Sequence, residues 1–197
     1  MKLKIKEFSN YLVDFSVANF QKSLGNKVII LDVGCGEGEF IVELASRHPG
    51  KEFLGVEIKY GRIIKCLRRT KLNGLSNLKF ALCDATIFIE KILPSNSLNK
   101  VFINNPDPWP KEKHQKNKLI RASFLKALYS KMKRKGALYI KTDSREYFEK
   151  IKEDIKKTKF SIDRTKNNFD SSLTLTKFQE LYKKGDRKIL GVKLIKK

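Results

Sequence analysis

Val28-Ile-Ile-Leu-Asp-Val-Gly-Cys-Gly-Glu-Gly-Glu-Phe40 is an apolar run that ends at an acidic residue and continues into three alternating glycines. The run from Val28 to Leu31 is short, β-branched and uncharged, as expected of a parallel strand buried on both faces. Gly34, Gly36 and Gly38 allow positive φ angles and a close approach of the backbone to a ligand. Because apolar residues at helical spacing follow, the stretch predicts a strand, a glycine turn and a helix. This arrangement places a binding crevice at the carboxyl end of the sheet.

The spacing of the glycines distinguishes between several known kinds of ligand-binding loop. A dinucleotide-binding loop has the pattern G-x-G-x-x-G, but Glu39 stands where its third glycine would be. A P-loop ends in Gly-Lys-Ser or Gly-Lys-Thr, whereas this loop ends in Gly-Glu-Phe. What remains, an acid followed by x-G-x-G-x-G, resembles the first motif of Rossmann-like methyltransferases that use S-adenosylmethionine, a cationic ligand without phosphate. A tight turn without a ligand is the alternative for this segment alone.

Acidic residues end three successive predicted strands. Asp32 follows the first strand, Glu57 lies near the end of Phe53–Ile58, and Asp84 ends Leu78–Asp84. A carboxylate at the end of the second strand can accept hydrogen bonds from both ribose hydroxyls. Asp84 can accept from an adenine amino group. The three residues therefore predict a row of carboxylates along one edge of the sheet, although Glu57 alone could be a solvated strand-end residue.

The fourth predicted strand, Lys100–Asn104, runs into Asn105-Pro-Asp-Pro-Trp-Pro-Lys-Glu-Lys-His114. Three prolines within five residues exclude a regular helix or strand and fix the backbone. The loop presents one carboxylate, Asp107, beside one large aromatic side chain, Trp109. This pair suits a flipped guanine, whose N1–H and amino group can donate to the acid while the indole offers a stacking face. Trp109 could instead plug the core.

Composition sets further limits. The chain of 197 residues is long enough for one α/β domain, and its net charge of +22 favours a polyanionic partner such as nucleic acid. The 34 lysines against 9 arginines leave a compositional bias as the other explanation. Three widely spaced cysteines and two histidines predict neither disulfides nor a metal site. We also expect no signal peptide, no membrane span and a cytoplasmic location.

The remaining pattern completes the expected architecture. Further strands are predicted at 136–142, 160–164 and 188–195, the last with the alternating character of an edge strand. We therefore expect one domain over 1–197, with a seven-stranded, mostly parallel sheet, one antiparallel edge strand and helices on both faces. Residues 1–25 are expected to form a helical arm, and the polar segment 165–175 a mobile loop.

The motifs together resemble the bacterial tRNA (guanine-N7-)-methyltransferase family over nearly the whole chain. The P-D-P-W-x-K-x-x-H loop carries most of the resemblance, supported by Lys141-Thr-Asp143 and Thr176-Lys-Phe-Gln179. The resemblance implies methyl transfer from S-adenosylmethionine, leaving S-adenosylhomocysteine, to N7 of guanosine 46 in tRNA by a monomer or homodimer without a metal. The implied donor contacts are Asp32, Gly34, Gly36, Gly38, Glu57, Asp84 and Asp107, with Asp107 also catalytic. The implied tRNA contacts are Lys111, Asp143, Thr176, Lys177, Phe178 and Gln179.

Three departures from the family pattern concern the substrate side. Gln179 stands where the family has a glutamate, and Asn104-Asn105 precedes the proline loop where the family tends to have an aromatic residue. The arginine-rich run after the family's histidine is also missing, which leaves Lys116, Lys118 and Arg121 to meet phosphates. Two other functions stay open: an adenine amino-methyltransferase, which shares an N-P-P-[YFW] type of loop, and an RNA-binding module without catalysis.

Overall fold

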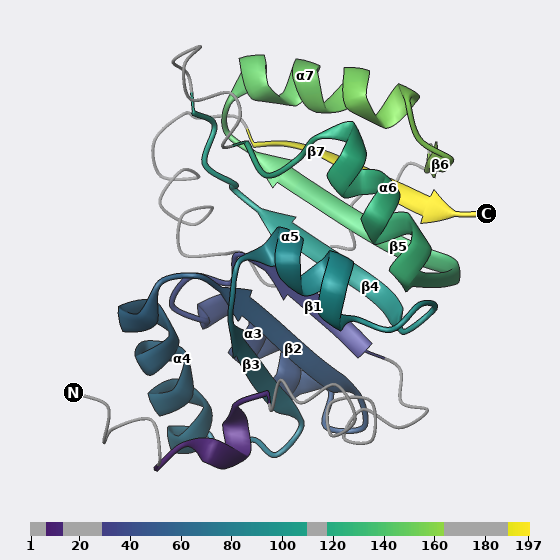
Figure 1. The fold of residues 1–197 in the computed structure, drawn as a ribbon. Helices are drawn as coiled ribbons and strands as arrows, with labels where there is room; N and C mark the ends of the chain where they lie inside the picture. Colours follow the sequence, from purple (N-terminus) through teal and green to yellow (C-terminus); the bar gives the residue numbers. More distant parts are fainter. Residues whose placement is uncertain (1–6, 14–28, 110–117, 164–188) are drawn as a thin grey trace.

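The fold is taken from a computed structural model that describes residues 7–13, 29–109, 118–163 and 189–197. Its centre is a seven-stranded sheet with the order β3-β2-β1-β4-β5-β7-β6 (Figure 1). The strands are β1 (Ile29–Val33), β2 (Glu52–Glu57), β3 (Leu78–Leu82), β4 (Leu98–Asn104), β5 (Met132–Thr142), β6 (Phe160–Ile162) and β7 (Leu190–Lys196). β1 to β5 pair in parallel, which confirms the predicted mostly parallel sheet.

The antiparallel strand is β7, as its alternating sequence suggests. It pairs antiparallel with β5 on one side and with β6 on the other. β7 therefore lies one position further in than the edge that we expected for it, because the three-residue strand β6 covers its outer side.

Helices cover both faces of the sheet. The helices of one face are α3 (Glu39–Arg47) and α4 (Tyr60–Leu72), whose apolar side chains pack with Ile30 and Phe53 in one core cluster. The other face carries α6 (Ala122–Lys131), α7 (Arg145–Lys156) and the π-helical turn η2 (Phe88–Ile92), which pack on Leu31 and Leu54 in a second cluster. Successive β1 residues thus face opposite layers, as a strand buried on both faces requires.

The N-terminal segment differs from its prediction where it is described. Ser9–Tyr11 forms a short 3₁₀ turn, η1, and Leu12 makes an isolated parallel bridge to Phe80 of β3. Phe8 is buried in the α3–α4 cluster, so this segment packs on the sheet through an aromatic side chain. The remainder of the predicted arm and the predicted loop 165–175 lie outside the described residues.

The order of the strands reverses direction between β1 and β4, and this decides where a ligand can bind. β2 and β3 extend the sheet on one side of β1, whereas β4 and β5 extend it on the other. The helices that follow β1 and β4, α3 and α6, therefore pack on opposite faces of the sheet, which leaves a crevice at the carboxyl ends of these strands. Among the described residues, no helix is long and apolar enough to cross a membrane.

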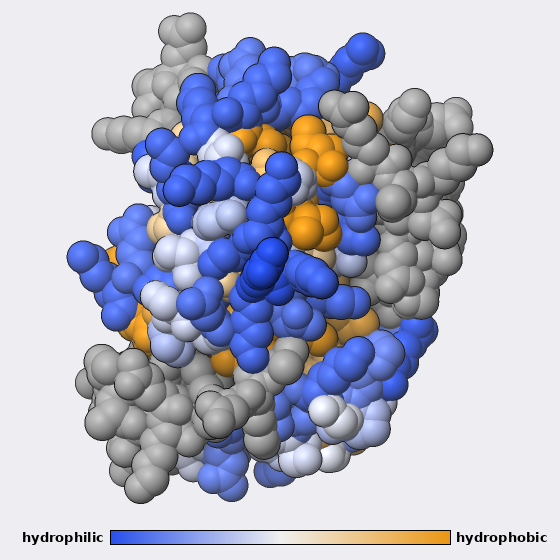
Figure 2. Space-filling model, turned by 90° about the vertical axis from the view of Figure 1, so that its right-hand side faces the viewer, coloured by the Kyte–Doolittle hydropathy of each residue, from blue (hydrophilic) through white to orange (hydrophobic). Residues whose placement is uncertain are grey.

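The view in Figure 2 shows a mainly hydrophilic face with small apolar patches.

Candidate donor and guanine site

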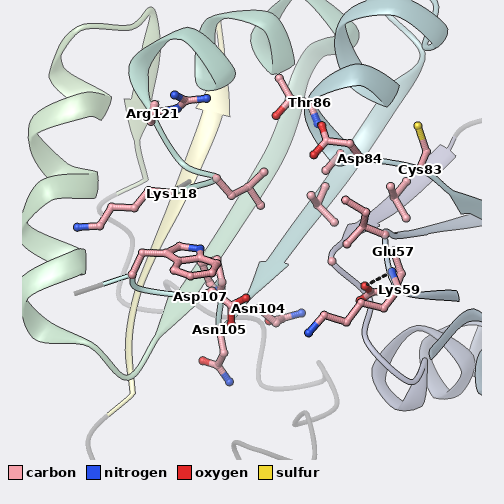
Figure 3. A pocket seen from close by; sticks show the side chains of 18 residues that line it. Glu57, Lys59, Cys83, Asp84, Thr86, Asn104, Asn105, Asp107, Lys118 and Arg121 are labelled. Atoms are coloured by element: carbon pink, nitrogen blue, oxygen red, sulfur yellow. Dashed lines mark hydrogen bonds between the residues drawn. The ribbon is translucent and has the colours of Figure 1, made fainter. Parts of the chain in front are cut away.

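A cavity of about 460 Å³ opens at the carboxyl ends of β1, β2, β3 and β4, next to this reversal point. It is bordered by Gly34 after β1, Glu57 and Lys59 after β2, and Asp84 after β3. Asn104 and the loop from Asn105 to Trp109 border its other side (Figure 3). Segments that are far apart in the sequence therefore meet around one space, as the strand-end acids predict.

Glu57 is buried, with 4% of its surface exposed, although it carries a carboxylate. Its Oε2 accepts a hydrogen bond from Gly36 N at 3.1 Å, and its Oε1 accepts from Lys59 N at 2.8 Å. Arg62 Nη1 lies 3.6 Å from Oε2 and adds a positive charge. Each carboxylate oxygen can accept more than one hydrogen bond, so Glu57 can fix the glycine turn and still bind a diol.

The three loop glycines all adopt the positive φ angles that their sequence predicts, at 71°, 60° and 84°. Only Gly34 is among the residues that border the cavity, and a Cβ atom added there would meet nothing within 4 Å. Gly36 is held by Glu57, and Gly38 packs against Cys66, whose Sγ would lie 3.0 Å from an added Cβ. Gly36 and Gly38 thus shape the loop, while Gly34 leaves open space beside it.

Asp32 lies beneath this cavity rather than on its surface. Its exposed fraction is 3%, and burial raises its pKa from 3.8 to about 7. The negative charge of Glu57 adds to the rise, and the nearby Asn104 side chain opposes it. A buried carboxylate with a raised pKa becomes easier to ionise when a cation binds nearby. A positively charged ligand in the crevice would therefore favour the ionised carboxylate of Asp32, and the two charges would attract each other.

Asp84 has a structural role as well as a place at the cavity. It is the N-cap of the short helix α5 (Ala85–Ile87), because its Oδ1 accepts from Thr86 N at 2.8 Å and from Ile87 N at 3.1 Å. These bonds use one oxygen and fix the orientation of the carboxylate. The second oxygen is available for a ligand in the cavity.

The proline loop brings Asp107 and Trp109 to the cavity together. Asn105 and Trp109 both have positive φ angles, of 47° and 42°. This region is unfavourable for a bulky side chain such as tryptophan, and strained residues of this kind cluster at functional sites. The prolines restrict the backbone of the loop, and this backbone places the Asp107 carboxylate and the Trp109 indole at the end of β4.

Asn104 and Asn105 were not among the predicted site residues, yet both border the cavity. Among the described residues, Asn104 Nδ2 and both side-chain polar atoms of Asn105 are buried without a hydrogen-bond partner. Asn104 Nδ2 lies near the Asp32 carboxylate but does not reach hydrogen-bond geometry with it. Buried polar groups are nearly always paired, so these atoms indicate a missing ligand. A polar pair directly after a buried strand was the sequence signal for them.

The predicted substrate residues are only partly described. Asp143 follows β5 at the same edge of the sheet but is not among the residues that border the cavity. The N-cap of α7 is Ser144, whose hydroxyl accepts from Tyr147 N, so Asp143 does not cap this helix. Lys111, Lys116, Thr176, Lys177, Phe178 and Gln179 lie outside the described residues.

The described residues around the cavity do not include a cluster of metal ligands. Within 7–13, 29–109, 118–163 and 189–197, no group of three or more His, Cys, Asp or Glu side chains is placed to hold a metal ion. Cys35 and Cys66 are buried free thiols, and Cys83 is partly exposed at the cavity. The hydrogen-bonded Cys66 thiol and, after it, burial raise the pKa of Cys35, so this thiol stays protonated at neutral pH.

Known proteins resemble the chain in sequence. The model of a family described as putative methyltransferase matches residues 26–192. A tRNA (guanine-N(7)-)-methyltransferase of Buchnera aphidicola subsp. Acyrthosiphon pisum (strain Tuc7) is 37% identical over 175 residues, which are 85% of this chain and 73% of that protein. A protein of the same name from Thermotoga maritima is 30% identical over 189 residues, or 95% of this chain. The chain spans only 58% of the length of the Thermotoga protein.

Solved structures resemble the chain in fold. One described as an antibiotic related methyltransferase has a TM-score of 0.66 at 19% identity, covering 94% of this chain and 97% of that one. The 16S rRNA methyltransferase KamB has a TM-score of 0.65 at 14% identity, covering 93% and 95%. At such identities the likeness shows the fold alone. Sequence and fold agree, and the chain belongs to the tRNA (guanine-N(7)-)-methyltransferase family of class I S-adenosylmethionine-dependent methyltransferases.

Proposed function

We propose that the protein transfers the methyl group of S-adenosylmethionine to N7 of guanosine 46 in the variable loop of tRNA. One observation carries the proposal: a single cavity brings the strand-end acids Glu57 and Asp84 together with Asp107 and Trp109 of the proline loop. The first pair suits the donor and the second suits a guanine. The names of the relatives support this choice of substrate. We also propose a cytoplasmic location, where tRNA is found.

The residues fit S-adenosylmethionine on four grounds. The donor is cationic, and the crevice contains the carboxylates of Asp32 and Glu57. Its ribose offers a diol, for which the two oxygens of Glu57 are suitable acceptors. The unpartnered Nδ2 of Asn104 can donate to an acceptor on the ligand. Gly34 leaves the open space that a close approach of the ligand to the backbone requires.

The chemistry needs alignment more than a strong base. Guanine N7 carries a lone pair and no proton, and S-adenosylmethionine supplies an electrophilic methyl group when it is bound. The chain therefore has to hold the base at the right distance and angle, which is an orientation effect. Asp107 can accept from the N1–H and amino groups of guanine, and its negative charge can stabilise the positive charge that develops on the base.

Two experiments test this function. A tRNA transcript with guanosine at position 46 should accept methyl groups, and the same transcript with adenosine there should not. Asp107→Asn should lower kcat by about 100-fold, because it removes a charge near the reacting base. The Kd for tRNA should change by less than about threefold, since the loop and its other contacts stay in place.

The exposed residue Glu90 on η2 provides a matched control. Glu90→Gln removes a carboxylate outside the cavity and should leave kcat unchanged. Persistent methylation of the adenosine-46 transcript would contradict the choice of target. Full activity of Asp107→Asn would contradict its catalytic role.

A further inference from the structure

One face of α4 lies against the glycine loop and the end of β2. Arg62, Cys66 and Arg69 are three or four residues apart, so successive turns of the helix bring them to the same side. The Cys66 thiol, for example, donates to the carbonyl oxygen of Gly36 at 3.2 Å. Although α4 is described in full, none of its residues borders the donor cavity. The helix can therefore act on a ligand in that cavity only through the residues that it contacts.

Two ion pairs of this face hold the glycine loop. Lys65 Nζ lies 2.6 Å from Glu37 Oε1, and Arg69 Nη2 lies 2.8 Å from Glu39 Oε1. All four side chains are at least 30% exposed, so each pair contributes little to stability by itself. Together they tie the residues on both sides of Gly38 to the same helix, and the loop is thereby held at a fixed distance from α4.

Arg62 makes the contact of this face that bears on the ligand. Its Nη1 lies 3.6 Å from Oε2 of Glu57, and among the described residues it is the only cationic side chain paired with this carboxylate. The Glu57 side chain is only 4% exposed, and its negative charge repels the buried Asp32, whose pKa it helps to raise. A buried carboxylate beside a second acid is costly without a positive charge nearby. Arg62 supplies that charge from the rim of the crevice.

The contacts of Glu57 fix its carboxylate and still leave acceptor capacity. Oε2 faces Gly36 N and Arg62, whereas Oε1 accepts only from Lys59 N, the bond that is drawn in Figure 3. Three contacts on two oxygens determine both the position and the rotation of the group. Because each oxygen can accept more than one hydrogen bond, both can still accept from a ribose diol.

We propose that Arg62 is a positioning residue for the methyl donor. It does not touch the ligand; it offsets the charge of the buried Glu57 carboxylate and holds that carboxylate in the orientation that accepts from the ribose hydroxyls. The ligand in question, an adenosyl compound with a ribose diol, is that of the proposed function, on which this role rests. The face of α4 thus prepares the donor site from outside the cavity.

Nucleoside binding to the full chain tests this role without any methyl transfer. Displacement of labelled S-adenosylhomocysteine would give the Kd of adenosine and of 2′,3′-dideoxyadenosine for the wild type and for Arg62→Met. Both nucleosides are uncharged, so the lost charge does not act on them directly. The substitution should weaken adenosine binding by about fivefold, the upper end for an ion pair with one exposed partner. It should weaken 2′,3′-dideoxyadenosine by less than about 1.5-fold, because that nucleoside offers Glu57 no hydroxyl.

Three variants separate positioning from a general effect on the fold. Arg62→Lys keeps the charge and should restore adenosine binding to within about twofold of the wild type. Arg68→Met removes an exposed arginine of the same helix that forms no ion pair with any described residue, and it should leave both Kd values unchanged. In a Glu57→Gln background, Arg62→Met should have no further effect on adenosine, because the charge on which Arg62 acts is absent.

Steady-state kinetics gives a second readout. Arg62→Met should raise the KM for S-adenosylmethionine by about fivefold and leave kcat within about twofold, since the bound donor meets the same groups at the reacting methyl. The KM for tRNA should stay at the wild-type value. If Arg62→Met fails to fold, Arg62→Gln provides the same comparison with a polar side chain.

The outcomes distinguish this role from the proposed reaction. Unchanged adenosine binding, an equal loss for the two nucleosides, or a loss that persists in the Glu57→Gln background overturns the positioning role, even if the wild type forms 7-methylguanosine. A loss confined to adenosine, in a protein that forms no 7-methylguanosine, supports the role of Arg62 and overturns the proposed reaction.

Discussion

Asp32→Asn is expected to stabilise the protein in the absence of a ligand, although the residue lies directly beneath the donor cavity. Asp32 is buried in β1 beside Gly55 of β2 and Phe102 of β4. Burial raises its pKa from 3.8 to about 7. The folded protein therefore disfavours the ionised carboxylate, and an amide of the same shape avoids that cost.

The size of the effect follows from the pKa change. A rise of about three pKa units corresponds to roughly 4 kcal/mol, at 1.36 kcal/mol per unit. Between about pH 4 and pH 7 the folded protein binds more protons at Asp32 than the unfolded chain does, so this residue lowers the free energy of unfolding as the pH rises. Asp32→Asn should therefore be more stable than the wild type by up to about 4 kcal/mol at pH 8, and by less than half of that at pH 5.

Urea unfolding of both proteins at pH 5 and pH 8 measures this difference. Asp84→Asn is the matched control, because asparagine also caps a helix; its free energy of unfolding should change by less than about 0.5 kcal/mol at either pH. Asp32→Asn should at the same time bind S-adenosylmethionine much more weakly, since the ligand loses a charge partner. A variant that is no more stable than the wild type at pH 8, or equally stabilised at both pH values, would refute this reasoning.

Three further substitutions test the geometry of the site. Glu57→Gln leaves one side-chain oxygen to serve two backbone N–H groups, so calorimetry should show donor affinity reduced by roughly 10-fold to 100-fold; an unchanged Kd would count against its role. Gly38→Ala forces a Cβ atom to within 3.0 Å of Cys66 Sγ at a φ of 84°, and thermal unfolding should show a loss of about 1–3 kcal/mol; equal stability would contradict the strain. Tyr147→Phe removes the acceptor of Ile120 N–H and should cost about 1–3 kcal/mol in urea unfolding, whereas no change would show that this bond is dispensable.

The sequence predicted those parts of the molecule that depend on local patterns. The run before Asp32 is β-branched and uncharged, and the strand, glycine turn and helix lie where this pattern places them. The acids Glu57 and Asp84 border one cavity because parallel strands bring their carboxyl ends to the same edge. Alternating glycines and proline-rich loops have few compatible conformations, so their geometry can be inferred without tertiary information.

Features that depend on packing between distant segments could not be predicted in this way. The inner position of β7 is due to β6, a strand of only three residues with no strong signal of its own. The cap of α7 is Ser144 rather than Asp143, and either residue type suits a cap. A smaller cavity of about 380 Å³ is lined by Tyr147 and Lys150 of α7 together with Lys118, which is about 30 residues away in the chain.

The chemical identity of the methylated product tests the proposed function most directly. The wild-type protein would be incubated with bulk tRNA lacking 7-methylguanosine and with methyl-labelled S-adenosylmethionine, and the digested nucleosides would be separated. We predict label in 7-methylguanosine and in no other nucleoside. Label in N6-methyladenosine, or no incorporation by a protein that binds tRNA, would contradict the proposal that this site methylates guanine at N7.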